Sequence, residues 1–212
     1  MDLSPELLLR AYAVGIFPMA ESRGEREIHW IDPDYRGILP LDAVHVPRRL
    51  ERRLRRGDFE VRCDTAFHQI IDACATPNSG RRETWINPII ERLYIALHEM
   101  GFAHSVECWQ DGKLCGGLYG VALGAAFFGE SMFYRVTDAS KVALVHLAAR
   151  LGKSGFTLLD TQFETSHLRQ FGVVEVSREV YRNRLARAVR TPAQFETELS
   201  EDELLAFLRS TR

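Results

Sequence analysis

Two extended segments joined by Asp111-Gly112 constrain the fold of this chain more than any other feature of its sequence. The Asp-Gly dipeptide is favoured in two-residue hairpin turns, where both residues take positive φ. The flanking segments, Ala103–Trp109 and Lys113–Val121, are therefore predicted to pair as an antiparallel hairpin. A third strand is expected over Ala125–Phe133.

Residues with strong N-cap preferences mark the starts of several helices. Ser4 precedes Pro5 and Asn87 precedes Pro88, and proline suits the first helical position because its missing N–H would be unpaired there. Ser200 is followed three residues later by Glu203, the spacing of a capping box. Further helices are predicted at 64–75, with Asp64 as the cap, at 139–151 and at 177–189; strands are predicted at 59–63 and 157–162, and loops at 17–47, with short strands, and 77–82.

The order of these elements predicts a mixed α+β fold rather than a doubly wound sheet, because an antiparallel hairpin is followed by a helix and a strand. The chain has 212 residues, of which 46% are hydrophobic, so it can bury a sizeable core. We expect a small N-terminal domain over 1–62, a sheet domain over 63–190, and an acidic C-terminal helix and tail over 191–212.

The charge balance excludes one class of function. Lysine and arginine number 27 against 29 aspartate and glutamate residues, whereas a histone-like or tail-driven nucleic-acid binder carries a large basic excess. The longest uncharged run, Leu114–Gly129, has 16 residues, fewer than the roughly 20 apolar residues that span a membrane. Four cysteines stand singly and no secretion signal opens the chain. We therefore expect a cytoplasmic protein without a disulfide framework.

One basic block runs from Pro47 to Arg56, and Leu50 and Leu54 interrupt it at the i, i+4 spacing of a helix face. Two interpretations stay open, a solvated amphipathic helix and a surface that binds an anion. The planar guanidinium fork suits phosphate contacts better than an ammonium does. The candidate phosphate-binding residues are Arg48, Arg49, Arg52, Arg53, Arg55 and Arg56.

Several common catalytic motifs are absent from the sequence. Residues 98–102 lack the second histidine of a zinc-protease helix, and no P-loop, G-x-G-x-x-G fingerprint or G-x-S-x-G elbow occurs. Cys108 and Cys115 stand in predicted strands, where a buried cysteine packs as a small hydrophobe. A covalent nucleophile is therefore not indicated, and His104 and His167 are assigned no catalytic role.

Polar side chains inside apolar segments are the remaining candidates for chemistry. Glu130 stands among aromatic residues in Phe127–Phe133, and Asp160 and Gln162 lie two residues apart on one face of a strand end. A carboxylate in such surroundings is costly to bury unless it is paired. For Glu130 and Asp160, a structural hydrogen bond and a role at an active site both stay open.

Eight short motifs follow one another in a specific order between about Leu3 and Ala188. They are Tyr12–Pro18, Thr84–Ile86, Leu97-His98 with Gly101, Ala103–Glu107, Gly116–Val121, Phe128–Phe133, Ala139–Lys141, and Asp160–Gln162 followed by His167-Leu168. Together they resemble the leucyl/phenylalanyl-tRNA-protein transferase family, bacterial enzymes that move an amino acid from aminoacyl-tRNA to a protein's N-terminus. The chain departs from the family at Met19, where tryptophan is common, and at Thr161, where cysteine is frequent.

The resemblance implies a catalytic domain of the GNAT (acetyltransferase) superfamily beside the small N-terminal domain. It implies transfer of Leu or Phe, with Met as a third candidate, to proteins that begin with Arg or Lys, which marks them for N-degron degradation. Aminoacyl-tRNA and these proteins are the expected partners of a monomer that needs no membrane, metal or organic cofactor. A GNAT-type N-acetyltransferase, a transferase that acts on peptidoglycan precursors and a non-catalytic protein that binds tRNA ends are the alternatives.

The resemblance also implies roles for individual residues. Asp160 orients Gln162, which contacts the incoming amine or the developing tetrahedral centre, either as part of a base relay or by positioning alone. Glu130 pairs with a cationic group of the acceptor or the donor, and Trp85 faces the terminal adenosine. With aminoacyl-tRNA as the donor, the arginines of the 48–56 block are the candidates for contacts with tRNA. The donor side-chain pocket is expected to be lined by Leu118, Met132, Leu147, Leu151 and Leu159.

Overall fold

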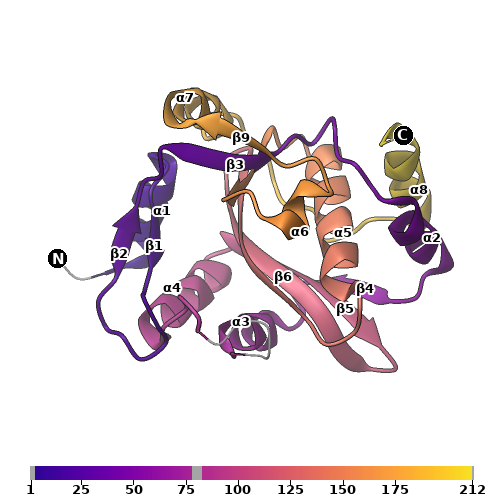
Figure 1. The fold of residues 1–212 in the computed structure, drawn as a ribbon, viewed down its shortest axis with the longest axis horizontal. Helices are drawn as coiled ribbons and strands as arrows, with labels where there is room; N and C mark the ends of the chain where they lie inside the picture. The colour runs from indigo at the N-terminus through magenta and orange to yellow at the C-terminus, as the bar shows by residue number, and fades with distance from the viewer. Residues whose placement is uncertain (1–2, 78–82, 212) are drawn as a thin grey trace.

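The computed structural model describes residues 3–77 and 83–211, and at its centre lies a seven-stranded mixed sheet (Figure 1). In spatial order the strands are β4 (Glu60–Cys63), β5 (Ala103–Gln110), β6 (Lys113–Leu123), β7 (Ala126–Tyr134), β8 (Leu158–Gln162), β3 (Tyr35–Leu39) and β9 (Val174–Ser177). Within these residue ranges, neighbouring strands are antiparallel except β7 and β8, which run parallel. The predicted mixed α+β fold is confirmed.

The predicted hairpin is formed by β5 and β6. Asp111 and Gly112 have φ of +51° and +69°, as a two-residue turn of type I′ requires. Gln110 pairs with Lys113 across this turn. The expected third strand, β7, continues the antiparallel meander.

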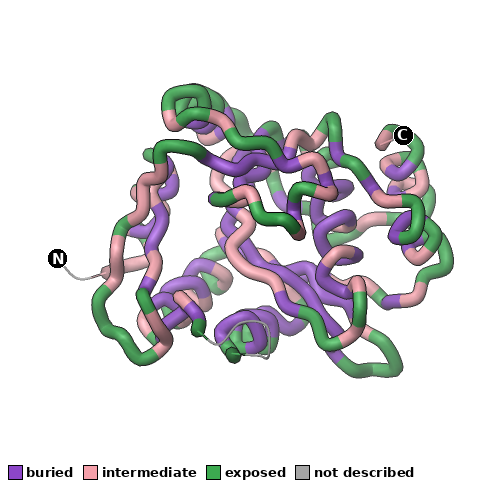
Figure 2. The backbone as a smooth tube through the Cα atoms, viewed as in Figure 1, coloured by how far each residue is buried: buried purple, intermediate pink, exposed green. Residues whose placement is uncertain are grey.

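Each face of the sheet has its own apolar core. Phe127 and Leu159 belong to the first core, whereas Phe128 and Leu158 belong to the second, because successive side chains of a strand point to opposite faces. Figure 2 shows that buried residues are concentrated in the central strands of the sheet and in the helices that pack against it. The first core contains α2 (Arg48–Arg56), α5 (Ala139–Lys153) and α8 (Glu201–Ser210), and the second contains α1 (Pro5–Ala13), α3 (Phe67–Ala75), α4 (Pro88–Glu99) and α7 (Arg178–Ala188).

Most predicted helix starts are confirmed. The side chain of Ser4 caps α1, that of Asn87 caps α4, and Ser200 forms a capping box with Glu203 at the start of α8. The expected cap by Asp64 is wrong. Its carboxylate instead accepts the backbone N–H of Ser105.

The start of α3 is held by a carboxylate from the neighbouring strand. Glu107 of β5 is fully buried and accepts the backbone N–H groups of Thr65 and Ala66. A negative charge there satisfies unpaired N–H groups at the positive end of the helix. Because this cap comes from another strand, the local sequence around Asp64 could not reveal it.

Residues 17–47 contribute more to the sheet than the expected loops with short strands. β1 (Phe17–Met19) and β2 (His29–Ile31) pair as a separate two-stranded sheet. β3, however, lies between β8 and β9, and β4 forms an edge of the same large sheet. A boundary at residue 62 would therefore cut strands from that sheet, and the division into domains stays a prediction.

The C-terminal segment also contributes to the core. Leu204 and Leu208 of α8 are buried in the first core, beside α5. The acidic helix expected over 191–212 is thus a packed element of the fold. Of the loop expected at 77–82, all but Pro77 lies outside the described residues. No helix within the described ranges is long and apolar enough to cross a membrane.

Candidate functional site

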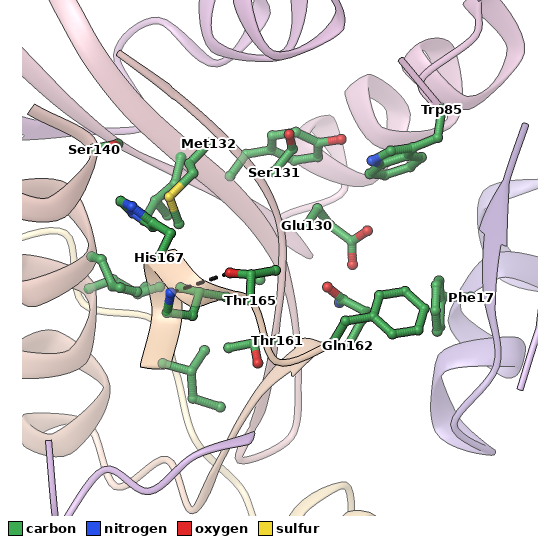
Figure 3. Close-up of a pocket in the computed structure, with 18 of the residues that line it drawn as sticks. Phe17, Trp85, Glu130, Ser131, Met132, Ser140, Thr161, Gln162, Thr165 and His167 are labelled. Carbon is green, nitrogen blue, oxygen red and sulfur yellow. Dashed lines mark hydrogen bonds between the residues drawn. The ribbon is translucent and has the colours of Figure 1, made fainter. Parts of the chain in front are cut away.

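A cavity of about 460 Å³ opens where the two parallel strands separate (Figure 3). β7 and β8 pair only over Ala126–Phe128 and Leu158–Asp160. The residues that follow in each strand, Gly129–Met132 and Thr161–Phe163, line the cavity from two sides. The carboxyl ends of parallel strands are a recurrent place for ligand sites, so the topology itself indicates this position.

The two ends of the cavity differ in the residues that line them. Figure 3 shows Trp85 and Phe17 at one end and Met132, Ser140 and His167 at the other, with Glu130 between. Met19 also lines the cavity. Five leucines also line the cavity, Leu118, Leu144, Leu147, Leu159 and Leu168. Leu144 and Leu147 share α5 with Ser140, Leu168 follows His167, and Leu118 is paired with Met132 across β6 and β7, which associates these aliphatic side chains with the second end.

Four of the five residues predicted for the donor side-chain pocket line this cavity: Leu118, Met132, Leu147 and Leu159. Leu151 is fully buried in the first core and is not among the lining residues, so the structure does not bring it to this cavity. The cavity meets the N-terminal half of α5, and Leu151 lies one helical turn beyond Leu147. Leu144, one turn earlier, takes that place.

Asp160 is fully buried and does not line the cavity. The Arg36 guanidinium donates to its carboxylate from Nε and Nη2, at 2.9 and 2.7 Å. Tyr181 donates its hydroxyl to the same carboxylate at 2.6 Å, and Gln162 donates its backbone N–H at 2.8 Å. These donors occupy both carboxylate oxygens, so the group is paired as a buried charge must be.

Arg36 is a site residue that sequence reasoning missed. It is 1% exposed, its guanidinium lies 4.4 Å from the centre of the Phe17 ring, and it also donates to the carbonyl of Gly15. It therefore links the N-terminal segment to Asp160, which is 124 residues away. No local pattern marks such a partner, and an arginine beside Tyr35 in a short strand reads as an ordinary surface residue.

Gln162 is held in an uncommon backbone conformation that directs its side chain to the cavity. Gly37 of β3 opposes Gln162 and Ile38 opposes Asp160, so Thr161 is an extra residue on β8, as in a β-bulge. Gln162 has φ of +56°, a left-handed conformation that non-glycine residues rarely adopt. Its Nε2 is buried and has no hydrogen-bond partner among the described residues.

Two further polar atoms of the cavity wall share this property. Thr161 Oγ1 and His167 Nε2 are also buried without a partner among residues 3–77 and 83–211. His167 belongs to the short helix α6 (Ser166–Arg169). Burial, and to a smaller extent Lys141, lowers the pKa of His167, so the imidazole is neutral at pH 7. Buried polar atoms are rarely left unpaired, and a polar ligand in the cavity can satisfy these.

Glu130 carries the one carboxylate among the lining residues of the cavity. The hydroxyls of Tyr12 and Tyr94 donate to its two oxygens, at 2.7 and 2.8 Å. Burial raises the pKa of Glu130 to about 7, although these two hydrogen bonds act in the opposite direction. The group can therefore change charge near neutral pH.

The predicted helix of the basic block is confirmed as α2, whose Leu50 and Leu54 are buried. Three of its arginines are in ion pairs: Arg53 with Asp58 and Asp138, Arg55 with Glu51, and Arg56 with Asp58. Arg48, Arg49 and Arg52 are exposed and form no ion pair within the described part of the chain.

The basic helix lies close to the cavity. Asp138, the partner of Arg53, immediately precedes α5, and Ser140 two residues later lines the cavity. A second hollow, of about 330 Å³, is bounded by Arg49, Arg52, Arg53, Arg56 and Asp138. Both arrangements suit a polyanion that approaches the cavity. Within the described ranges, no group of three His, Cys, Asp or Glu side chains is arranged to hold a metal ion.

Comparisons with known proteins identify relatives across the whole fold. Residues 38–186 match the family described as leucyl/phenylalanyl-tRNA protein transferase, and residues 1–34 match the N-terminal domain of that family. The leucyl/phenylalanyl-tRNA–protein transferase of Paramagnetospirillum magneticum is 61% identical over 92% of this chain and 93% of its own length. That of Phenylobacterium zucineum is 61% identical over 89% and 85%.

A solved structure, that of a functionally unknown conserved protein from Staphylococcus epidermidis, aligns over 84% of this chain and 66% of its own. Its TM-score is 0.41 and its sequence identity 9%. A similarity this distant does not indicate a function.

Proposed function

The chain belongs to the leucyl/phenylalanyl-tRNA-protein transferase family and is an aminoacyltransferase, and we propose that it moves Leu or Phe from aminoacyl-tRNA onto proteins that begin with Arg or Lys. Met is a third donor within this proposal. The modified proteins carry a new N-terminal residue that marks them for degradation. The enzyme acts in the cytoplasm as a monomer and needs no cofactor, because the aminoacyl ester already supplies an activated carbonyl.

The observation that carries the proposal is Gln162 Nε2, which has no hydrogen-bond partner among the residues that the structure describes and lies in the wall of a largely apolar cavity. An amide N–H is a donor, so its natural partner is an acceptor such as the ester carbonyl oxygen. That oxygen gains negative charge as the amine attacks, and a donor already fixed in place stabilises the charge without rearranging. Asp160 acts through the backbone of Gln162 and is a positioning residue.

The reaction needs little beyond correct placement of two reactants. The neutral α-amine attacks the carbonyl carbon, the C–N bond forms and the C–O ester bond breaks. The released ribose oxygen takes up the proton that the amine loses. An α-amino pKa near 8 leaves a useful neutral fraction at pH 7. Holding both groups in contact contributes up to roughly 7–11 kcal/mol in well-oriented systems.

The two ends of the cavity suit the two parts of the donor. We assign the aliphatic end, with Leu118, Met132, Leu147 and Leu159, to the side chain of the transferred residue. The end with Trp85 is assigned to the terminal adenosine, where an indole can stack on a base. Met19, in place of the family's tryptophan, offers a flexible apolar contact there.

Glu130 is assigned to the acceptor. A carboxylate in the cavity pairs favourably with the guanidinium or ammonium of an N-terminal Arg or Lys. The arginines of α2 are assigned to tRNA phosphates, with Arg48, Arg49 and Arg52 most available because they carry no ion pair within the described residues. A catalytic domain with the GNAT fold beside a small N-terminal domain completes the proposal, and the separate family match to residues 1–34 supports a distinct N-terminal unit.

Transfer from labelled leucyl-tRNA to peptides that begin with Arg, Lys or Ala tests the proposed function. Label on the Arg and Lys peptides, and not on the Ala peptide, is the expected result. Label on none of them, or on all three equally, would contradict the proposed acceptors. An aminoacyl-adenosine analogue should compete with leucyl-tRNA, and Gln162→Ala, run in parallel, ties the transfer to this cavity.

A further inference from the structure

Gly37 lies where β3 meets the segment that follows Gln162. A Cβ atom added to Gly37 would lie 2.7 Å from the carbonyl carbon of Phe163 and 2.9 Å from the backbone nitrogen of Glu164. These are backbone atoms, so no rotation of a side chain can relieve the overlap. Any residue other than glycine must therefore displace one of the two backbones.

β3 is the less movable of these two backbones. It is held on one side by β8, where Ile38 opposes Asp160, and on the other by β9, where Tyr35 to Ile38 are all paired. Arg36, the residue before Gly37, is fixed by its ion pair with Asp160. Phe163 and Glu164, by contrast, follow the end of β8 and belong to no strand or helix. The displacement therefore falls on Phe163 and Glu164.

This segment also carries the side chains that line the cavity. Gln162 and Phe163 are lining residues, and Phe163 contacts the edge of the Phe17 ring with 5.9 Å between the ring centres. Gln162 already has a left-handed backbone that its N–H bond to Asp160 maintains. A shift of the next peptide unit rotates this backbone and moves Nε2 away from its present position.

We propose that Gly37 is a positioning residue for the transfer reaction, because its missing side chain lets the backbone after Gln162 approach β3 closely enough to hold the Gln162 side chain in the cavity wall. The inference rests on the role proposed for Gln162. Gly37 itself touches neither substrate and acts through the placement of Gln162. Gly37 should therefore affect turnover more strongly than the binding of the donor.

A double-mutant cycle with Gly37→Ala and Gln162→Ala tests this inference. Gly152→Ala is the matched control, because Gly152 is exposed, has no atom within 4 Å of an added Cβ and has no positive φ. Transfer rates are measured at saturating donor and acceptor. The folded fraction is counted by titration with a non-reactive aminoacyl-adenosine analogue, so that the rate refers to folded enzyme only.

We expect Gly37→Ala to lower kcat about tenfold or more while the Kd of the analogue changes less than about threefold. In the Gln162→Ala background, Gly37→Ala should lower kcat by less than about twofold, since both substitutions act through the Gln162 side chain. Gly152→Ala should match the wild type.

Four results would overturn the inference. If Gly37→Ala has a wild-type kcat while Gln162→Ala is inactive, the role proposed for Gly37 is rejected and that of Gln162 is kept. The same conclusion follows if the effects of the two substitutions on kcat simply multiply in the double variant. A Gly37→Ala chain that binds no analogue at any temperature assigns the glycine to folding and rejects positioning. If Gln162→Ala itself keeps the wild-type kcat, the role proposed for Gln162 fails and the inference fails with it.

Discussion

Gln162 donates its backbone N–H to the carboxylate of Asp160 across 2.8 Å, and this bond supports the left-handed backbone of Gln162. The other donors to the same carboxylate are Arg36 and Tyr181. With both oxygens occupied and no access to the cavity, Asp160 is poorly placed to remove a proton. Of the two roles left open by the sequence, base relay and positioning, the geometry favours positioning.

Gln162→Ala should lower transfer strongly without weakening the fold. Its Nε2 forms no hydrogen bond within the described residues, so its removal breaks no hydrogen bond there. Loss of a donor to a developing oxyanion typically lowers kcat by about 10²- to 10³-fold. Single-turnover rates, with analogue affinity as the control, measure this. A rate within a factor of about two of the wild-type rate would contradict the role of Gln162 as a donor to the oxyanion.

Asp160→Ala should act mainly on stability. It leaves the Arg36 guanidinium buried and unpaired, a change that costs about 3–5 kcal/mol in the free energy of unfolding. Urea unfolding of Asp160→Ala measures this cost. The double variant Asp160→Leu/Arg36→Met should recover much of the lost stability, since it removes both charges together. Equal stabilities of wild type and Asp160→Ala would show that the pair contributes little.

Selection of cationic acceptors should depend on pH through Glu130. Its pKa, raised by burial to about 7, makes the group neutral below that pH and a carboxylate above it. The ratio of kcat/KM for Arg-starting over Ala-starting peptides should therefore rise between about pH 6 and about pH 8. Taking this ratio largely removes the titration of the α-amine, which both peptides share. In Glu130→Gln the ratio should not vary with pH. If this variant instead showed the same rise with pH as the wild type, another group would be responsible for the pH dependence.

The exposed arginines of α2 should determine the salt dependence of tRNA binding. The double variant Arg49→Ala/Arg52→Ala should reduce the log-log slope of affinity against salt by about one unit for each phosphate that the protein no longer neutralises. Arg184→Ala/Arg187→Ala, which removes the same charge from exposed positions on α7, is the matched control. Transfer from an aminoacyl-adenosine donor should be equal in both variants. Equal slopes for the α2 and α7 double variants would show that α2 is a solvated helix that does not contact tRNA.

The four cysteines should be unreactive in the folded protein. All four are buried, and burial raises the pKa of Cys63 to about 12 and that of Cys108 further. Since the thiolate is the reactive form, a thiol reagent should label the native enzyme slowly and leave transfer unchanged. Labelling of all four should follow denaturation in urea. Rapid inactivation of the native enzyme by the reagent would contradict this.

The elements that depend only on neighbouring residues could be predicted from the sequence. The Asp111-Gly112 turn, the helix start at Asn87 and the capping box at Ser200 each involve groups within three residues of one another. Such contacts form wherever the local chain allows them, so their signals can be read directly. The motifs around Glu130 and Gln162 could likewise be recognised, and the cavity lining was predicted at Leu118, Met132, Leu147 and Leu159.

The partners of these groups, in contrast, depend on how distant parts of the chain come together in the fold. Arg36 meets Asp160 across 124 residues and Tyr12 meets Glu130 across 118, and no periodicity links such distant positions. The insertion of β3 between β8 and β9 was missed for the same reason, as was the packing of Leu151 away from the cavity. A buried charge needs a partner, but its chemistry leaves open which of many arginines or tyrosines supplies it. Chain topology makes that choice, because it alone brings one particular side chain within hydrogen-bond distance.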